Sequence, residues 1–148
     1  RARIESLVRR IDAGLPRIDR LTDLYNAVSV AHLVPVGGEN LDRYVGPPRL
    51  VRAAGDELFD TVADGEHVVV SADPGEVVWR DDDGVTCRRW NWRQASGLDP
   101  SAGNVLFILD GLHPLTDDDL RAAGDAIVEA VTAGSPDAVV SSRLIGAS

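Results

Sequence analysis

The sequence contains no methionine and only one cysteine, Cys87. A single cysteine excludes an internal disulfide framework and a zinc site built from several cysteines. Because the chain starts at Arg1 and holds no methionine, we expect a further N-terminal region to precede it. No apolar run approaches the roughly 20 residues that span a bilayer, and no basic segment leads into an apolar stretch as in a signal peptide. These absences favour a cytoplasmic protein with no membrane partner.

The length and composition are those of a small globular protein. The chain has 148 residues, of which 44% are hydrophobic and 26% charged, and this is enough to bury a core in one compact domain. We therefore predict a single domain over 1–148, with residues 1–20 forming the end of the preceding region.

The charge is acidic but unevenly distributed. The net charge of −9 argues against tight, sequence-independent binding of nucleic acid. Residues 1–20 nevertheless hold six arginines against three acids, whereas residues 110–137 hold seven acids against Arg121 alone. A polyanion can dock at the arginine-rich end with marked salt sensitivity. The alternative is a generally acidic surface with no polyanion partner.

Apolar spacing and breaker residues predict helices at both ends of the chain. Ile4, Leu7, Val8 and Ile11 recur at helical spacing, and a second helix is expected from about residue 22 to 33. The proline and paired glycines at 35–38 predict an irregular segment. A third helix is expected to begin at Thr116, because the three acids that follow it lie at the positive end of the helix dipole, and to end at Gly134.

Short strands with turn residues between them fill the middle of the chain. The predicted strands are 50–54, 66–71, 76–80, 85–92, 104–109 and 138–145. Gly84 follows Asp83 in a hairpin turn and is expected to adopt a positive φ. The predicted fold class is α+β, with a mostly antiparallel central sheet flanked by helices.

The strand expected at 85–92 carries an unusual concentration of arginine and tryptophan. Alternation predicts that residues 87, 89 and 91 share one face and that 88, 90 and 92 share the other. Arginine and tryptophan planes suit bases and ribose, and arginine forks suit phosphate. The alternative is that the tryptophans are core anchors and the arginines solvated caps.

No residue pattern by itself identifies a reaction. His32, His67 and His113 lack the spacing of metal ligands, and we expect no metal site and no cofactor. There is no nucleophile elbow and no glycine-rich phosphate loop.

Six blocks of the sequence carry a resemblance to known proteins. They are Asp23–Ser29, Pro35–Asp42, Gly55–Glu57, Pro74–Val78, Cys87–Arg93 and Asn104–Leu106. Together they resemble one family, the freestanding relatives of the editing domain of the bacterial phenylalanyl-tRNA synthetase beta subunit, called B-three/B-four. The resemblance runs from about residue 15 to 135, and the blocks occur in the expected order.

The resemblance implies a trans-editing aminoacyl-tRNA deacylase, a hydrolase of translation quality control that binds the acceptor end of aminoacylated tRNA. In the synthetase, this domain hydrolyses tyrosine wrongly esterified to tRNA. Two family residues are missing, because the histidine after the motif proline is replaced by Gly37 or Gly38, and the glutamate that reads tyrosine is replaced by Ile108. Asp110 lies two residues on, on the same strand face. We therefore expect an amino acid other than tyrosine as the substrate.

Within this resemblance, candidate roles follow residue by residue. The Gly37 and Gly38 amides can donate to the developing oxyanion, or the pair is a plain tight turn. Asn26 and Asn91 can hold ribose hydroxyls or the water, and Asn26 can instead be a buried amide that fixes the loop. Glu39 or Asp110 can bind the α-amino group or act as base. Arg89, Trp90 and Trp92 are expected to contact the substrate. The three arginines of this stretch are also expected to contact the tRNA end or to brace the acidic turn at 81–83, and they are Arg88, Arg89 and Arg93.

Two other functions fit the same residues. One is a non-catalytic module that binds an amino acid, a nucleoside or a tRNA end, which the missing histidine and the acidic charge favour. The other is an interaction domain of a larger chain. The three functions differ in their expected behaviour. A deacylase turns over its substrate, a binding module saturates without turnover, and an interaction domain does neither.

Overall fold

The computed structural model describes residues 2–9, 18–89, 91–98, 102–111 and 115–146. The chain divides into two compact units, each described here by itself. Unit 1 comprises Arg1–Leu41 and Leu98–Ser148, and unit 2 comprises Asp42–Gly97. Each unit has its own cluster of buried apolar side chains.

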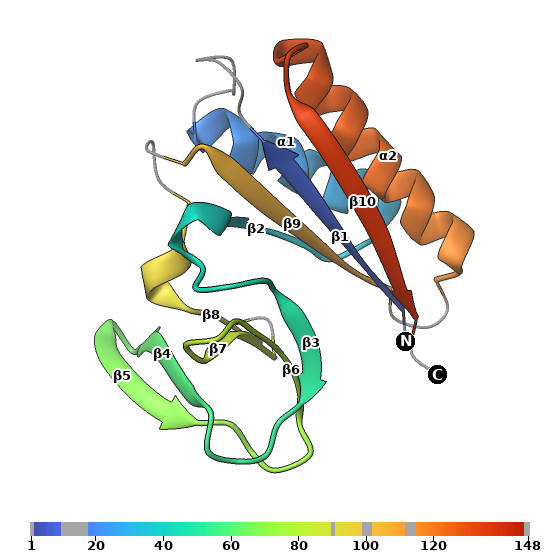
Figure 1. The fold of residues 1–148 in the computed structure, drawn as a ribbon. Coiled ribbons are helices and arrows are strands. Elements are labelled where there is room, and N and C mark those ends of the chain that lie inside the picture. The colour runs from blue at the N-terminus through green and yellow to red at the C-terminus, as the bar shows by residue number, and fades with distance from the viewer. Residues whose placement is uncertain (1, 10–17, 90, 99–101, 112–114, 147–148) are drawn as a thin grey trace. The chain divides into compact units, whose positions relative to one another are not determined.

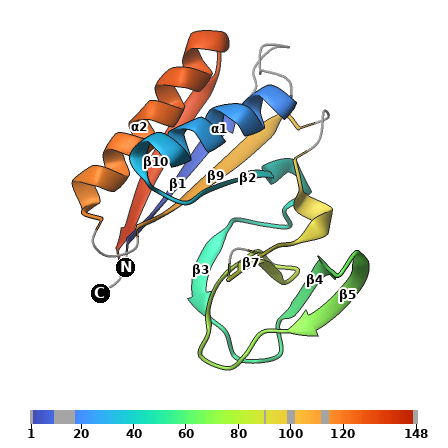
Figure 2. The ribbon, with the colours of Figure 1, turned by 180° about the vertical axis from the view of Figure 1, so that it is seen from behind.

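Unit 1 is a four-stranded antiparallel sheet with two helices on one face (Figures 1 and 2). The helices are α1 (Ile18–His32) and α2 (Asp117–Gly134). In spatial order the strands are β10 (Val139–Gly146), β1 (Ala2–Arg9), β9 (Asn104–Gly111) and β2 (Val36–Asn40).

Strand β9 is the centre of the unit 1 core because both of its faces are buried. Val105, Phe107 and Leu109 pack with the helix residues, and the alternate residues Leu106 and Ile108 are equally buried on the other face. Burial on both faces explains why β9 reads as an unbroken apolar run in the sequence.

Helix α2 begins where the sequence predicts. The Thr116 hydroxyl accepts the Asp119 amide, and the Thr116 amide donates to the Asp119 carboxylate, which is a capping box. These hydrogen bonds hold the pKa of Asp119 below its usual range.

Unit 2 contains short strands in two sheets. One sheet has the order β3 (Arg49–Arg52), β6 (Val77–Arg80), β7 (Val85–Arg88) and β8 (Asn91–Trp92), and the other is the hairpin of β4 (Leu58–Ala63) and β5 (Glu66–Ser71). Two short 3-10 turns, Leu41–Arg43 and Gln94–Ser96, lie at the boundaries of the unit.

The α+β class with antiparallel strands is confirmed, but three local predictions were wrong. The helix expected from Ile4 to Ile11 is strand β1 over residues 2–9, and the irregular segment expected at 35–38 is mostly strand β2. The strand expected at 85–92 is instead a hairpin that reverses at Arg89, so Arg88 pairs with Asn91 and Cys87 with Trp92. In each case pairing with distant or neighbouring strands overrides the local pattern.

The hairpin at Asp83 and Gly84 forms, but for a different reason than the sequence suggested. Gly84 is not among the glycines with positive φ. A Cβ at this position would lie 2.6 Å from the backbone oxygen of Leu58. The glycine is required by the close approach of β4.

Candidate functional site

Predicted site residues of unit 1 gather on the face of its sheet opposite the helices. Strand register places Gly37 opposite Ile108 and Glu39 opposite Leu106, and paired residues project to the same face. Asp110 lies on this face as well, two residues beyond Ile108. We call this set, Gly37, Glu39, Leu106, Ile108 and Asp110, the Gly37 face.

Two buried carboxylates bracket the Gly37 face. Glu39 and Asp110 are each only 1% exposed. Their register positions are four residues apart along the strands, which corresponds to about 13 Å. Gly37 lies between them and has no side chain, and it is buried as they are.

The two glycine amides point in opposite directions. The Asp110 amide donates to the Pro35 oxygen at 3.1 Å, and alternation then turns the Gly37 amide toward β9 and the Gly38 amide toward the outer edge of β2. Strand β2 is the last in the described sheet. The Gly38 amide is therefore the one of the pair that this sheet leaves available to a ligand.

Gly38 also has a packing reason to be glycine. A Cβ there would lie 3.1 Å from Leu98, 3.1 Å from Tyr25 and 3.3 Å from Phe107. The Tyr25 and Phe107 rings meet edge to face at 5.9 Å. The pair is thus part of a strand, and the prediction of a tight turn is wrong.

Asn26 lies apart from the Gly37 face. It is exposed on α1, and α1 packs against the opposite face of the sheet through Leu21 and Val28. The alternative of a buried amide is therefore wrong, and a role for Asn26 on the substrate stays a prediction.

In unit 2, Arg93 forms a buried ion pair with the acidic turn. Its guanidinium donates to both carboxylate oxygens of Asp81, at 3.1 and 2.7 Å, and lies 5.4 Å from the centre of the Tyr44 ring. Burial opposes the charge on Asp81, but hydrogen bonds from Arg93 and from the Val45 and Asp83 amides outweigh it and hold the pKa below its usual range. Arg93 therefore braces this turn, as one of the two sequence interpretations expected.

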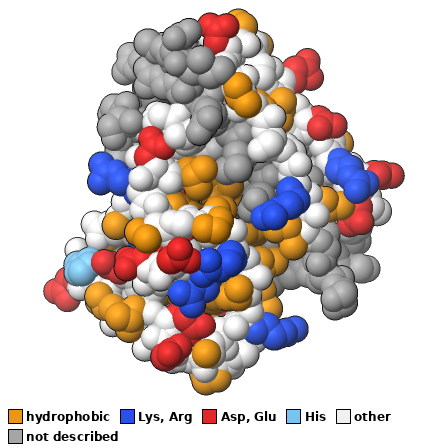
Figure 3. All heavy atoms as spheres, viewed as in Figure 1, with side chains coloured by type: hydrophobic (Ala, Val, Ile, Leu, Met, Phe, Trp, Pro, Cys, Tyr) orange, Lys and Arg blue, Asp and Glu red, His pale blue; other side chains and the backbone are white. Residues whose placement is uncertain are grey.

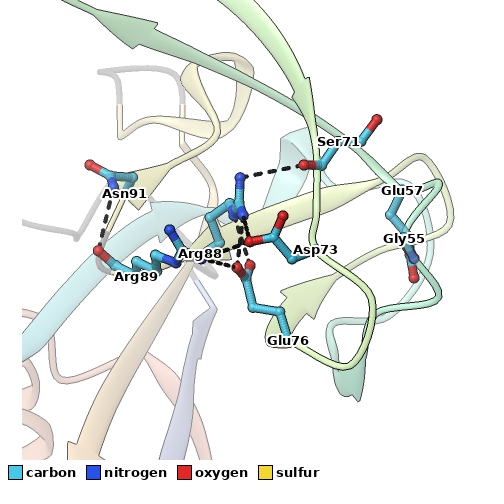
Figure 4. Close-up of polar contacts among 8 residues, drawn as sticks. All are labelled: Gly55, Glu57, Ser71, Asp73, Glu76, Arg88, Arg89 and Asn91. Atoms are coloured by element: carbon cyan, nitrogen blue, oxygen red, sulfur yellow. Dashed lines mark hydrogen bonds and ion pairs between the residues drawn. The ribbon is translucent and has the colours of Figure 1, made fainter.

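Arg88 and Arg89 brace a different turn, the one that contains Asp73 and Glu76. The Arg88 fork donates to both oxygens of Glu76 at 2.7 Å, and Arg89 donates to Asp73 at 2.8 Å (Figure 4). The hydrogen bonds from Arg88 lower the pKa of Glu76. Figure 4 also shows Asn91, whose side-chain amide donates to the Arg89 oxygen at 3.4 Å.

The tryptophans of this stretch are less informative. Trp92 is half-buried, and its backbone oxygen accepts the Thr61 hydroxyl at 3.1 Å. Trp90 lies outside the described residues, as does His113. Contacts of either tryptophan with a substrate stay predictions.

Glu57 is a structural carboxylate that the sequence analysis did not single out as such. The Ala54 and Gly55 amides donate to it at 2.8 and 2.9 Å, and they lower the pKa of Glu57 to about 2. The sequence signal for this role is that Glu57 follows Gly55 by two residues, because a turn of this kind presents consecutive backbone amides to a carboxylate.

Basic side chains do not form a continuous patch on the face of the molecule in Figure 3, where described acidic and basic groups are intermingled. Every one of the 15 basic residues in the chain is arginine.

Within the described residues, no group of three or more potential ligands is placed to hold a metal ion. No described helix is long and apolar enough to cross a membrane.

A cavity of about 200 Å³ lies elsewhere in unit 1, between α2 and β10, and contains none of the predicted site residues. Its lining residues are Arg121, Gly124, Asp125, Ser142, Arg143 and Leu144.

Comparison with known proteins gives one family and one fold. A family model described as the B3/4 domain matches residues 1–124. The structure is similar to the crystal structure of an N-terminal fragment of the phenylalanyl-tRNA synthetase beta-subunit from Pyrococcus horikoshii, with a TM-score of 0.69 at 12% identity. The match covers 98% of this chain and 50% of that fragment, so the chain spans half its length. No curated protein matches the sequence.

Proposed function

The chain belongs to the B3/4 domain family, and from this premise we propose that it hydrolyses the ester between a wrong amino acid and the 3′ end of a tRNA. The observation that carries the proposal is the Gly37 face, on which two buried carboxylates bracket a stretch of backbone without a side chain. A cytoplasmic location and action as a freestanding protein belong to the same proposal.

The chemistry needs little from the protein. An aminoacyl ester is already activated, so a positioned water and stabilisation of the oxyanion supply most of the acceleration. In our assignment Asp110 accepts the proton of the attacking water, and Glu39 binds the α-ammonium group of the aminoacyl moiety. A carboxylate held in a buried site is suited to either role.

The oxyanion requires a hydrogen-bond donor. The Gly38 amide, on the outer edge of β2, is the donor that we assign to it. One such donor contributes about two to three orders of magnitude in rate.

A non-catalytic module that binds an amino acid or a tRNA end is the second candidate. Within this candidate an amino-acid ligand is favoured over a tRNA end, because Arg88 and Arg93 already hold carboxylates in bidentate pairs. A protein with a net charge of −9 and few available arginines is expected to bind RNA weakly.

The test is release of labelled amino acid from a panel of correctly and wrongly charged tRNAs, with a control lacking protein. Release from one or a few mischarged species supports the deacylase. Saturable binding of these species without release favours the second candidate and contradicts the first.

Asp110→Asn tests the assignment of the base. We expect the rate of release to fall at least about a hundredfold, the scale of a lost general base, with the folded state retained because the side chains are nearly isosteric. Asp137→Asn, an exposed acid of the same unit, is the control for the charge change and is expected to keep the full rate. Full activity of folded Asp110→Asn contradicts the assignment.

A further inference from the structure

Arg89 occupies a backbone conformation that disfavours it. Its φ is +48°, in the left-handed region, and it lies in the tight turn between β7 and β8, whose residues Arg88 and Asn91 are paired. Asparagine and glycine are the residues that such turns prefer. An arginine in this conformation points to a role for its side chain.

The two neighbouring arginines differ in how they are held. The Arg88 and Glu76 side chains are each 12% exposed and form a bidentate pair. The Arg89 and Asp73 side chains are 66% and 65% exposed and share a contact of 2.8 Å. The Arg88 pair is therefore a fixed part of the turn, whereas the Arg89 pair lies in water and is easily exchanged.

Arg89 also reaches Glu76, at 3.0 Å. Because Glu76 has both oxygens bound by Arg88, it keeps its partner when Arg89 leaves. Asp73 keeps a longer contact with Arg88, at 3.4 Å, and is exposed to water, so the departure of Arg89 buries no unpaired charge. The Arg89 guanidinium can thus change partners while the turn stays intact.

We propose that Arg89 binds a phosphate group of an RNA backbone and that the Asp73 carboxylate is its internal competitor, occupying the guanidinium when no phosphate is bound. A guanidinium fork fits phosphate oxygens in the same bidentate way that it fits a carboxylate. Asp73 then sets the affinity for RNA by mass action. The choice of RNA as the source of the phosphate rests on the proposed function.

The experiment is a double-mutant cycle on the full chain with Asp73→Asn, Arg89→Asn and both together. The probe is uncharged tRNA, with binding measured over a salt series. Asn suits the left-handed turn at residue 89, so Arg89→Asn removes the charge without straining the hairpin. Asp64→Asn is the control for net charge, because Asp64 is an exposed acid of unit 2 that also has a positive φ, of 52°.

We expect Asp73→Asn to tighten binding about threefold to tenfold, the scale of one relieved charge contact, and Asp64→Asn to change it less. Arg89→Asn should weaken binding and reduce the slope of log affinity against log salt by about one. The double variant should bind like Arg89→Asn alone. Persistence of the Asp73→Asn gain in the Arg89→Asn background would overturn the proposal, since the gain would then be a general charge effect.

Stability separates this role from a merely structural one. If Arg89 only braces the turn, Arg89→Asn lowers the melting temperature and leaves RNA binding unchanged, which contradicts the proposal. We expect the reverse, an unchanged or higher melting temperature with weaker binding. Inorganic phosphate, titrated at constant ionic strength, should compete only far above the RNA concentration. Competition by phosphate at a concentration equal to that of the RNA would identify free phosphate as the ligand of Arg89 and would contradict the assignment to RNA.

Failure of the proposed function is distinguishable from failure of this inference. Coupling of Asp73 and Arg89 in RNA binding, with no amino acid released from any charged tRNA, removes the deacylase and leaves the phosphate site. Release of amino acid without that coupling supports the deacylase and removes the phosphate site at Arg89.

Discussion

At the scale of single residues, the most consequential contact is the buried pair of Arg93 and Asp81. Arg93 comes from the segment after β8, and Asp81 begins the turn between β6 and β7. The Asp81 carboxylate also accepts the amides of Val45, Asp83 and Gly84. One carboxylate therefore fixes three segments of unit 2.

Arg93→Met is expected to destabilise the protein by about 3–5 kcal/mol, because it leaves the Asp81 charge buried without its counter-ion. Arg93→Lys should recover little, since an ammonium cannot form both hydrogen bonds. The free energy of unfolding in denaturant measures the effect.

The same turn supplies the control for Arg93. Arg49 and Asp82 form an exposed pair at 2.6 Å, and Arg49→Met should change the free energy of unfolding by about 1 kcal/mol or less. Equal losses for the two arginine variants would contradict the importance of burial.

The residue scale also shows what the sequence could reveal of the site. The resemblance identified Gly37, Gly38, Glu39 and Asp110, and register places them on two adjacent strands. It could not show that the two glycine amides point apart, because that depends on which residue of β2 faces β9. Nor could it show that the partner of Arg89 is Asp73, since 16 residues separate the two in the chain.

At the scale of elements, the hairpin of β6 and β7 is limited by the close approach of β4 at Gly84. Gly84→Ala places a Cβ 2.6 Å from a backbone oxygen, which cannot move as a side chain can. We expect a loss of about 1–3 kcal/mol in the free energy of unfolding, the scale of overpacking.

Gly97→Ala is the matched control for Gly84→Ala. Its nearest contact would be 3.4 Å, and its φ is −61°. Alanine fits this conformation, so stability should be unchanged or slightly higher. Equal stability of the Gly84→Ala and Gly97→Ala variants would mean that β4 adjusts freely.

Elements defined by local signals were predictable, and those defined by distant pairing were not. Helix α2 carries its own cap at Thr116, and β5 is a run of β-branched residues between turn residues, so both were found with nearly correct bounds. Strand β1 carries apolar residues that also fit a helix, and only its pairing with β9 and β10 decides the outcome. Those partners lie 95 to 109 residues away in β9 and 130 to 144 residues away in β10, and they leave no mark on the local pattern.

At the scale of the whole molecule, acid should act first on unit 2. The pKa values of Glu57, Glu76 and Asp81 are all lowered in the folded state. A lowered pKa means that each carboxylate contributes stability above its unfolded pKa and loses it as the pH falls through the folded value. For Glu57 this window runs from 4.5 down to about 2.

Two optical signals separate the units in an acid titration. All three tryptophans lie within 42–97, which is unit 2, and both described α-helices belong to unit 1. We expect tryptophan fluorescence to change at a higher pH than the helical circular dichroism. Glu57→Gln should reduce the pH dependence of the fluorescence transition between pH 4.5 and 2. Coincident transitions would show that the units unfold together.

The place of β1 between β9 and β10 has a consequence for synthesis on the ribosome. Unit 2 is one continuous segment and can assemble as soon as residue 97 has emerged. The sheet of unit 1 must wait, because β1 has no strand partner until β9 and then β10 are made. Strand β1 leaves the ribosome before its partners but pairs with them late, and during that interval its apolar residues depend on chaperones or transient contacts for protection.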